Sequence, residues 1–335
     1  MTRRIRPCLL AVAAIILTQT GMPARGDAIY TVRDLGALPG DRGAAVFGIN
    51  NSGQVLVASG VDSGPGGSYV DNGGSRTLLP ASLGFAYGFN NSGQFASPSS
   101  SPALSGNLAI NDLGQVAGTG ANGDLALQTQ SGVTDLGSLG GKPGLNGVNA
   151  INNSGQIVGF GIGSDGRNHP FLFSGGHFTE LGIAGGAAYG INDKGSVVGG
   201  SGAESVNPFL YQNGKLTDLG SLAGRGGLAH SINNLGQIVG WSVINQAGDH
   251  HAFLYQNGSM VDLNNLIPKG GFTLFSAQGI NDQGSIIVDA VDATSIHALL
   301  LTRAVPEPSS YLILAGSSVA LLLSRRRRRA RDIVV

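Results

Sequence analysis

The stretch Ile49-Asn50-Asn51-Ser52-Gly53-Gln54-Val55 decides the fold, because close copies of it recur along the chain. Further copies begin at Phe89, Ile110, Ile151, Ile191, Ile232 and Ile280, at spacings of 40, 21, 41, 40, 41 and 48 residues. A regular period of this length is typical of repeat architectures. Every copy keeps one asparagine and one glycine: Asn50 and Gly53, Asn90 and Gly93, Asn111 and Gly114, Asn152 and Gly155, Asn192 and Gly195, Asn233 and Gly236, Asn281 and Gly284.

The motif predicts a hairpin turn between two short apolar strands. An asparagine side chain can bond its own backbone, the Asn/Asp positions fit a type I turn, and the glycine supplies the positive φ that closes it. A calcium loop is the alternative, because Asn, Asp and Gly clusters also bind calcium. Calcium takes six to eight oxygen ligands, usually several carboxylates, whereas most copies offer one carboxylate or none. A turn therefore explains the motif better.

Two further strand signatures fall between the turns. The first is aromatic, as in Pro170-Phe171-Leu172-Phe173, and the second reads Thr-Asp-Leu-Gly, as in Val133-Thr134-Asp135-Leu136-Gly137. A turn containing glycine, such as Gln212-Asn213-Gly214-Lys215, joins them. Each repeat of about forty residues thus supplies four short strands in two hairpins, the content of one β-propeller blade.

The two ends of the repeat region complete one another. Residues 30–36 form a lone strand of the second type, and residues 297–301 form a lone strand of the first type. Pairing them closes a ring and removes exposed sheet edges. We predict an all-β domain over residues 29–303 that folds as a β-propeller. The 21-residue spacing has room for one hairpin only, so the predicted number of blades is six or seven. A β-solenoid with coils of about twenty residues is the alternative, since the short spacing also suggests it.

Composition limits the possible functions of this region. Residues 29–304 carry ten basic and seventeen acidic side chains, a net charge of −7, which does not provide the basic surface that nucleic acid requires. Cys8 is the one cysteine, so we expect no disulfide and no thiolate metal ligand in the exported region. The 56 glycines of the chain suit a fold with many tight turns.

The search for catalytic chemistry yields little. The carboxylates Asp34, Asp135, Glu180, Asp218 and Asp262 share one repeat position, which suits a structural role at strand ends. No Ser-His-Asp arrangement is readable, and we predict no catalytic residues, no cofactor and no metal. Two weaker hypotheses are kept: a metal site if His169, His251 and His297 ring the propeller axis, and a glycan site at Trp241.

Both ends of the chain predict export. Residues 1–28 have the basic, apolar and small-residue order of a signal peptide. Residues 304–331 contain Val305-Pro306-Glu307-Pro308, an apolar stretch over 311–323 that we interpret as a single transmembrane helix, and the cluster Arg325, Arg326, Arg327, Arg328 and Arg329. Thirteen apolar residues span only about 20 Å as a helix, which favours a temporary anchor, and the arginines hold the C-terminus in the cytoplasm.

This tail resembles the PEP-CTERM sorting signal of Gram-negative bacteria, and an ordinary tail anchor is the alternative. The resemblance implies recognition by an exosortase and removal of the tail after passage through the Sec translocon. The repeats resemble the HAF family of extracellular repeats, named after His-Ala-Phe, on the residues His251-Ala252-Phe253 and the altered forms His169-Pro170-Phe171 and His297-Ala298-Leu299. In another copy Asn207 takes the place of the histidine, which indicates a structural position.

Together these patterns predict an exported protein, held briefly in the inner membrane and then released to the cell surface or matrix. We expect a structural, adhesive or binding role beside exopolysaccharide or surface proteins, because the sorting signal resembles that of systems linked to exopolysaccharide production. The alternative is a secreted propeller enzyme that acts on a glycan. Such an enzyme should bring different, non-repeated polar residues together at its axis, whereas the polar residues of the motifs repeat.

Overall fold

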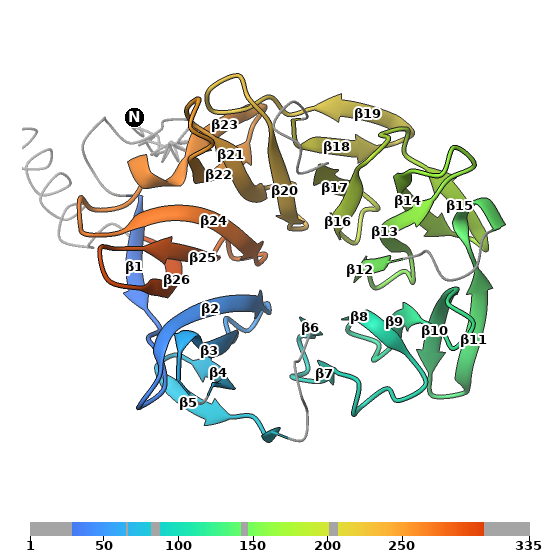
Figure 1. Cartoon of the computed structure of the whole chain (residues 1–335), viewed down its shortest axis with the longest axis horizontal. Coiled ribbons are helices and arrows are strands. Elements are labelled where there is room, and N and C mark those ends of the chain that lie inside the picture. The colour runs from blue at the N-terminus through green and yellow to red at the C-terminus, as the bar shows by residue number, and fades with distance from the viewer. Residues whose placement is uncertain (1–28, 65, 82–87, 142–146, 201–206, 305–335) are drawn as a thin grey trace, which may run out of the picture.

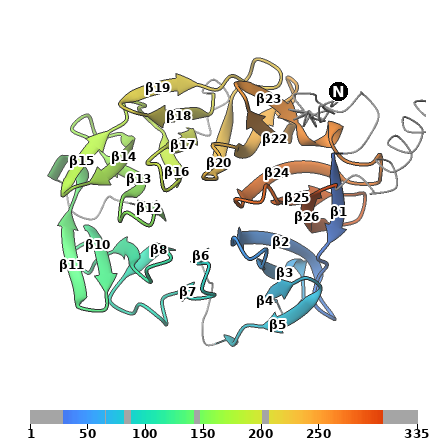
Figure 2. The same ribbon diagram turned by 180° about the vertical axis from the view of Figure 1, so that it is seen from behind.

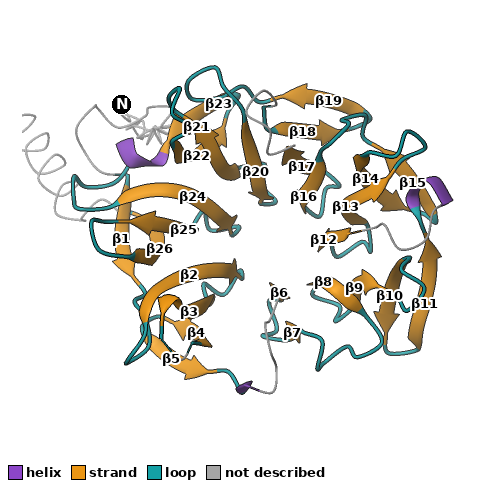
Figure 3. Ribbon diagram, viewed as in Figure 1, coloured by secondary structure: helices purple, strands orange, loops and turns teal. Residues whose placement is uncertain are grey.

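Strands arranged in a ring make up the structure, a computed structural model that describes residues 29–64, 66–81, 88–141, 147–200 and 207–304. These residues form seven sheets, six with four strands and one with two, placed around a central axis in a propeller-like arrangement (Figures 1 and 3). We number the sheets 1 to 7 in chain order. Every strand pairing within them is antiparallel.

In sheets 1 to 6 the strands follow one another along the chain, and in the four-stranded members the first strand lies nearest the axis. Sheet 1 contains β2 (Arg42–Ile49), β3 (Val55–Ser63), β4 (Gly67–Asn72) and β5 (Ser75–Leu78). Sheet 2 contains β6 (Gly88–Phe89) and β7 (Phe95–Ala96), and sheet 3 contains β8 (Ser105–Ile110), β9 (Val116–Thr119), β10 (Leu125–Thr129) and β11 (Gly132–Gly137). Sheet 4 contains β12 (Gly147–Ile151), β13 (Ile157–Ile162), β14 (Asn168–Ser174) and β15 (His177–Glu180).

The remaining sheets follow the same plan. Sheet 5 contains β16 (Ala187–Ile191), β17 (Val197–Gly200), β18 (Phe209–Gln212) and β19 (Lys215–Asp218). Sheet 6 contains β20 (Gly227–Ile232), β21 (Ile238–Val243), β22 (His250–Gln256) and β23 (Ser259–Asp262). Sheet 7 contains β24 (Thr273–Ile280), β25 (Ile286–Val291), β26 (Ile296–Arg303) and, as its outer strand, β1 (Tyr30–Asp34). Short 3-10 helices, η2 (Leu139–Gly141) and η3 (Leu263–Asn265), follow β11 and β23.

The two ends of the repeat region pair in sheet 7. Strand β1 lies antiparallel to β26, with Tyr30 opposite Arg303 and Asp34 opposite Leu299. The predicted pairing of these lone strands is therefore confirmed, and the β-solenoid alternative is wrong, because the N-terminal strand completes the last sheet of a ring. The first and last strands of the repeat region are therefore hydrogen-bonded neighbours.

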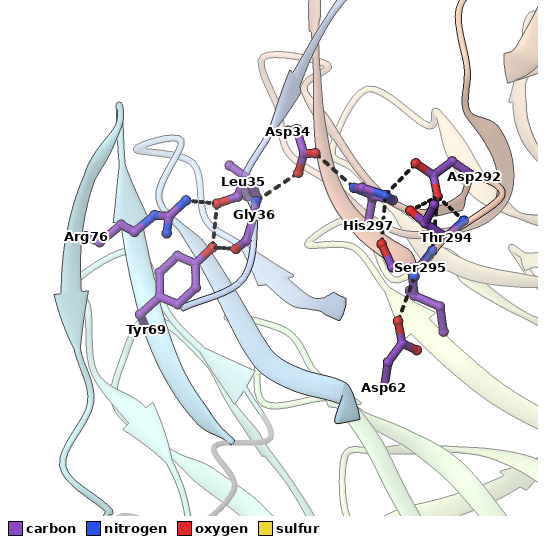
Figure 4. A network of polar contacts seen from close by, with 11 residues as sticks. Asp34, Leu35, Gly36, Asp62, Tyr69, Arg76, Asp292, Thr294, Ser295 and His297 are labelled. Carbon is purple, nitrogen blue, oxygen red and sulfur yellow. Dashed lines mark hydrogen bonds and ion pairs between the residues drawn. The ribbon is translucent and has the colours of Figure 1, made fainter. Parts of the chain in front are cut away.

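A polar network reinforces this junction (Figure 4). The His297 Nδ1 atom lies 2.9 Å from Asp34 Oδ2, joining the last strand to the first. The Tyr69 hydroxyl of sheet 1 donates to the carbonyl oxygens of Leu35 (2.8 Å) and Gly36 (2.6 Å), just after β1, and the Arg76 guanidinium also donates to the Leu35 carbonyl. Burial raises the pKa of Tyr69 to about 12, which keeps this hydroxyl a donor.

Apolar side chains fill every interface between neighbouring sheets. Seven clusters of buried residues cover the seven interfaces in turn, including the closing one, where Val46 and Val57 of sheet 1 pack with Ile287 and Leu300 of sheet 7. The second strands of the sheets, such as β13, β17 and β21, are covered on both faces, so their residues are buried at nearly every successive position instead of alternating. Burial between sheets, at roughly 25 cal/mol per Å² of apolar surface, therefore holds the ring together.

The short spacing between the second and third motifs explains the two-stranded sheet. Residues 89–110 hold the β6–β7 hairpin but no second hairpin, so sheet 2 has only β6 and β7 between two complete neighbours. Seven repeated turns, one of them followed by a short spacing, thus give six full sheets and one small one. The signal peptide, the sorting residues 305–308, the apolar stretch and the arginine cluster lie outside the described residues. Among those described, no helix is long and apolar enough to cross a membrane.

Candidate functional site

The seven repeated turns line a pocket of about 230 Å³. The inner strands of the sheets surround the central axis, as the view from behind shows (Figure 2). Each turn is a tight hairpin: in sheet 4 the Asn152 N–H donates to the Gln156 carbonyl at 3.0 Å, and the Gly155 N–H donates to the Asn152 carbonyl at 3.0 Å. The seven turn glycines have φ between 72° and 80°, the left-handed region that favours glycine. The glycine position of the motif is thus set by backbone geometry.

A ring of hydrogen bonds links the first asparagine of each turn to the next sheet. The side-chain amide of Asn152 accepts two backbone N–H groups of its own turn and donates to the Asn192 carbonyl in the following sheet. The same donation, at 2.9 to 3.3 Å, joins each asparagine to the next around the ring, and Asn281 closes it on the Asn50 carbonyl at 3.1 Å. These asparagines are at most 5% exposed. Every repeat keeps this asparagine because its side chain both stabilises its own turn and bonds the next sheet.

The second residues of the turns form another ring. Each backbone N–H donates to the side-chain Oδ1 of the corresponding residue in the next sheet, at 2.6 to 3.0 Å, and Asp282 closes the ring by donating to Asn51. The Asp112 Oδ2 atom also accepts from the side-chain amides of Asn91 (2.7 Å) and Asn153 (2.9 Å). Partial burial acts to raise the pKa of Asp112, but the three hydrogen bonds from Asn91 and Asn153 outweigh it and lower the pKa.

These bonds bear on the calcium alternative. Asp193 Oδ1 accepts the Asn153 N–H, and its Oδ2 atom accepts from the amides of Asn153 and Asn234. Asp282 is bonded in the same way by Asn234 and Asn51. The turn carboxylates therefore serve as acceptors that join neighbouring sheets, and this role accounts for them without a metal ion.

A layer of apolar side chains lies next along the axis. It comes from the first residue of each motif: Ile49, Phe89, Ile110, Ile151, Ile191, Ile232 and Ile280. Four of these residues also line a second pocket of about 210 Å³, between strands β2, β12, β16, β20 and β24. We call this second pocket the axial chamber. The axis thus carries a polar ring, an apolar layer and the axial chamber in succession.

β-Bulges place the side chains that distinguish the axial chamber. In five inner strands the pairing skips one residue, two positions before the motif isoleucine, and these residues are Phe47, Asn149, Tyr189, His230 and Gln278. A bulge leaves the extra residue unpaired and redirects its side chain. The next residue must be small because the inner strands approach closely: a Cβ added at Gly190 would lie 2.9 Å from the His230 carbonyl oxygen. The bulge residues differ from sheet to sheet within this repeated frame.

Two bulge side chains bond the following sheet. The Asn149 amide donates to the Ala188 carbonyl at 2.8 Å, and the His230 Nδ1 atom lies 3.0 Å from the Ala277 carbonyl. Burial lowers the pKa of His230, and the bond to Ala277 only partly opposes this. Burial also raises the pKa of Tyr189, whose ring meets the His230 ring edge-on at 6.0 Å between centroids. At neutral pH the ring of His230 is therefore uncharged.

Gln278 is held by a buried carboxylate. Its amide donates to Asp289 Oδ2 at 2.8 Å, while Asp289 Oδ1 accepts the Val46 N–H of sheet 1 at 2.9 Å. Burial raises the pKa of Asp289 to about 6, although both hydrogen bonds act to lower it. Asp289 thus links the closing interface of the ring to the axial chamber.

Sequence reasoning missed the axial chamber. The polar residues of the turn motifs repeat, as the sequence indicates, whereas Tyr189, His230 and Gln278 differ from one another at one position of the repeat. A signal for them exists: in the five bulged strands the residue two places before the Ile-Asn pair varies, whereas its neighbours are small or apolar. Variation at one position inside a strict internal repeat is a useful sign of a binding surface.

The histidines of the HAF-like sequences occupy another place, and the hypothesis that they ring the axis is wrong. They begin third strands, away from the axis, and each contacts a carboxylate at the outer-strand end of its own sheet. The His251 Nδ1 atom lies 2.7 Å from Asp262 Oδ2, and His297 bonds Asp34. In sheet 5 the Asn207 amide donates to Asp218 Oδ2 at 3.0 Å. The position is structural, because an amide replaces the imidazole without loss of the contact.

The repeated carboxylates also cap the backbone that follows them. The second oxygen of Asp34, Asp135, Asp218 and Asp262 accepts the N–H two residues later, at 2.7 to 2.8 Å. His169 contacts Glu180 at 2.6 Å, without the alignment of a hydrogen bond, and also Asp165 at 2.9 Å. These side chains join the two outer strands of a sheet and are not available as a general acid and base pair.

Trp241, the residue considered for glycan binding, lies in β21 of sheet 6. Its ring centroid is 5.0 Å from that of His250, and the His250 ring meets the Phe275 ring at 6.0 Å. His250 and Phe275 line a pocket of about 380 Å³ beside Asp249 and His251, whereas Trp241 is absent from its lining. Trp241 supports this pocket through His250.

Comparison with known proteins identifies the end of the chain. The model of the PEP-CTERM protein-sorting motif matches residues 304–329. The chain carries a PEP-CTERM sorting motif. This confirms the predicted PEP-CTERM sorting signal and implies an exported protein that an exosortase processes. The search of the curated proteins finds no match.

Solved structures with similar arrangements have low sequence identity. AofleA from Arthrobotrys oligospora is 10% identical, with a TM-score of 0.38 over 82% of this chain and 93% of that one. The Trypanosoma rangeli sialidase, in complex with the inhibitor DANA, is 11% identical, with a TM-score of 0.42 over 86% and 58%. The BP39L lectin from Burkholderia pseudomallei is 16% identical, with a TM-score of 0.31 over 76% and 83%.

Proposed function

We propose that the chain is an exported, seven-bladed β-propeller with a structural, adhesive or binding role at the cell surface or in the exopolysaccharide matrix. The sorting motif over residues 304–329 is the observation that carries this proposal. The Sec translocon and an exosortase act on the chain during export, and its C-terminal tail anchors it in the inner membrane until the tail is removed.

The geometry of residues 29–304 supports a binding scaffold. The ring closes by strand pairing between its ends and by two rings of hydrogen bonds at the axis, so it presents a rigid frame outside the cell. The three axial carboxylates are engaged by neighbouring amides, and the repeated histidines join outer strands. The axial chamber does bring different polar side chains together, but no Asp or Glu belongs to the lining formed by the described residues, whereas most glycan-hydrolysing enzymes use a pair of carboxylates; we therefore propose binding in place of catalysis. The varied side chains of the axial chamber support binding within this frame.

Intact mass tests the proposed export. The protein is recovered from outer-membrane, matrix and medium fractions of cells with and without their exosortase. We expect a form that begins near Ile29 and ends near Pro306 or Pro308 in exosortase-positive cells only. Retention of the arginine tail in both strains would refute the surface function and leave a tail-anchored protein of the inner membrane.

A further inference from the structure

The axial chamber gathers side chains that the repeat architecture does not require. Strands β2, β16, β20 and β24 contribute Phe47, Tyr189, His230 and Gln278 by the same bulge, and Ser231 follows His230. The other lining residues are glycine, alanine and isoleucine. The distinctive chemistry of the axial chamber therefore lies in these five side chains.

The hydrogen bonds already made determine which atoms remain free. The Ala277 carbonyl can only accept, so His230 carries its proton on Nδ1 and exposes the Nε2 lone pair. The Gln278 amide nitrogen donates to Ser276 Oγ and to Asp289, which leaves its Oε1 atom as an acceptor. The Tyr189 and Ser231 hydroxyls have no partner among the described residues. The free capacity of the axial chamber consists mainly of acceptors, with hydroxyl groups that can serve either way.

Aromatic surface and size limit the ligand further. The side chain of Phe47 is 46% exposed, although large apolar side chains in a ring core are normally buried. Together with Tyr189 it offers aromatic surface on which an apolar ring face can lie. A volume of about 210 Å³ is below the roughly 300–1,000 Å³ of sites for drug-sized ligands. The axial chamber therefore suits one small ring with several donors.

Charge excludes acidic and basic ligands. No Asp, Glu, Lys or Arg belongs to the lining formed by the described residues, and His230 is neutral because burial lowers its pKa. Asp289 lies behind Gln278, and three aspartates line the neighbouring turn pocket, which shares the isoleucine layer. An anionic ligand would meet these negative groups without a compensating cation, and a cation would find no carboxylate in contact.

We propose that the axial chamber binds one neutral pyranose residue, with its apolar face on Phe47 and Tyr189 and its hydroxyl groups donating to His230 Nε2 and Gln278 Oε1. This proposal deepens and rests on the proposed binding role in the matrix, because polysaccharides are built from such sugar residues. The site lies where sequence reasoning did not expect it, away from Trp241.

Calorimetry and saturation-transfer NMR on the processed protein test the proposal. The probes are the methyl glycosides of glucose, galactose, mannose and N-acetylglucosamine, with glucuronate as the charged counterpart. We expect at least one neutral glycoside to bind, and glucuronate to bind at least about tenfold more weakly, since a lost hydrogen bond or an unpaired charge costs about 1.4 kcal/mol or more. Absence of binding by all neutral probes, or preference for glucuronate, overturns the proposal.

Matched variants locate the site. Tyr189→Ala should weaken binding about tenfold or more, and Tyr189→Phe, which keeps the packing, should lose only the contribution of the hydroxyl group. Trp241→Ala is the control, because Trp241 lies outside the axial chamber, and it should leave affinity unchanged. Loss of binding in Trp241→Ala with full binding in both Tyr189 variants overturns the assignment. The export proposal fails separately, through the retained arginine tail, whatever the sugar measurements give.

Discussion

Replacement of Asn152 by alanine tests the axial hydrogen-bond ring directly. The side chain makes four hydrogen bonds: it accepts from the Ser154 and Gln156 N–H groups and donates to Gln156 Oε1 and to the Asn192 carbonyl. It is 4% exposed, so water does not replace these partners. At about 0.5–1.5 kcal/mol for each net hydrogen bond, we expect a loss of about 2–6 kcal/mol of unfolding free energy. That is a large part of the roughly 5–15 kcal/mol typical of a folded domain.

Urea unfolding of the processed protein, followed by circular dichroism, measures this loss. Ser154→Ala is the matched control, because its side chain is exposed in the same turn, and it should change stability by less than about 0.5 kcal/mol. Asn192→Ala removes three such bonds, because Ser196 stands where Asn152 has Gln156, and should cost about 1 kcal/mol less. Equal stability of Asn152→Ala and Ser154→Ala would refute the reasoning.

Three further predictions follow from contacts described above. Between pH 3.8 and 6 the folded protein retains a proton on Asp289 that the unfolded chain has lost, so this group makes stability fall as pH rises, by up to about 3 kcal/mol. Asp289→Asn should therefore gain stability relative to wild type between pH 4 and pH 7 in urea titrations, and a constant difference would contradict this. His251→Asn should keep the contact with Asp262, as Asn207 does with Asp218, whereas His251→Ala should cost about 1 kcal/mol, and equal melting temperatures of the two variants would count against it. Removal of divalent cations with EDTA should leave the melting temperature unchanged, because amides already engage the turn carboxylates, and a fall reversed by calcium would restore the calcium hypothesis.

Local signals made much of the ring predictable. The positive φ of Gly155 is a property of its own turn, and the lone strand at Tyr30 has one partner of the complementary type, so both were visible in the sequence. The sorting tail was visible for a similar reason, since Pro306, Glu307 and Pro308 form a linear signal.

The chemistry of the axis was harder to predict because it depends on neighbouring sheets. The alternation of residues in a strand does not reveal that the pairing skips Tyr189. The bulge is accompanied by a close approach of the adjacent strand to Gly190. This approach brings Gly190 near the His230 carbonyl oxygen, about forty positions away in the sequence. The hydrogen bond from Asn153 to Asp193 likewise exists only when the ring is assembled.

The odd number of sheets also limits how donors and acceptors can be arranged in the hydrogen-bond ring formed by the second residues of the turns. Going around the axis they are Asn51, Asn91, Asp112, Asn153, Asp193, Asn234 and Asp282, so amide donors alternate with carboxylate acceptors except between Asn51 and Asn91. Strict alternation can close only in an even ring, and a ring of seven must contain one pair of like groups. Asn91 belongs to the small sheet, and without it the other six alternate perfectly. The half-size blade is thus the odd member added to an even set, and its position is marked by the one mismatched pair.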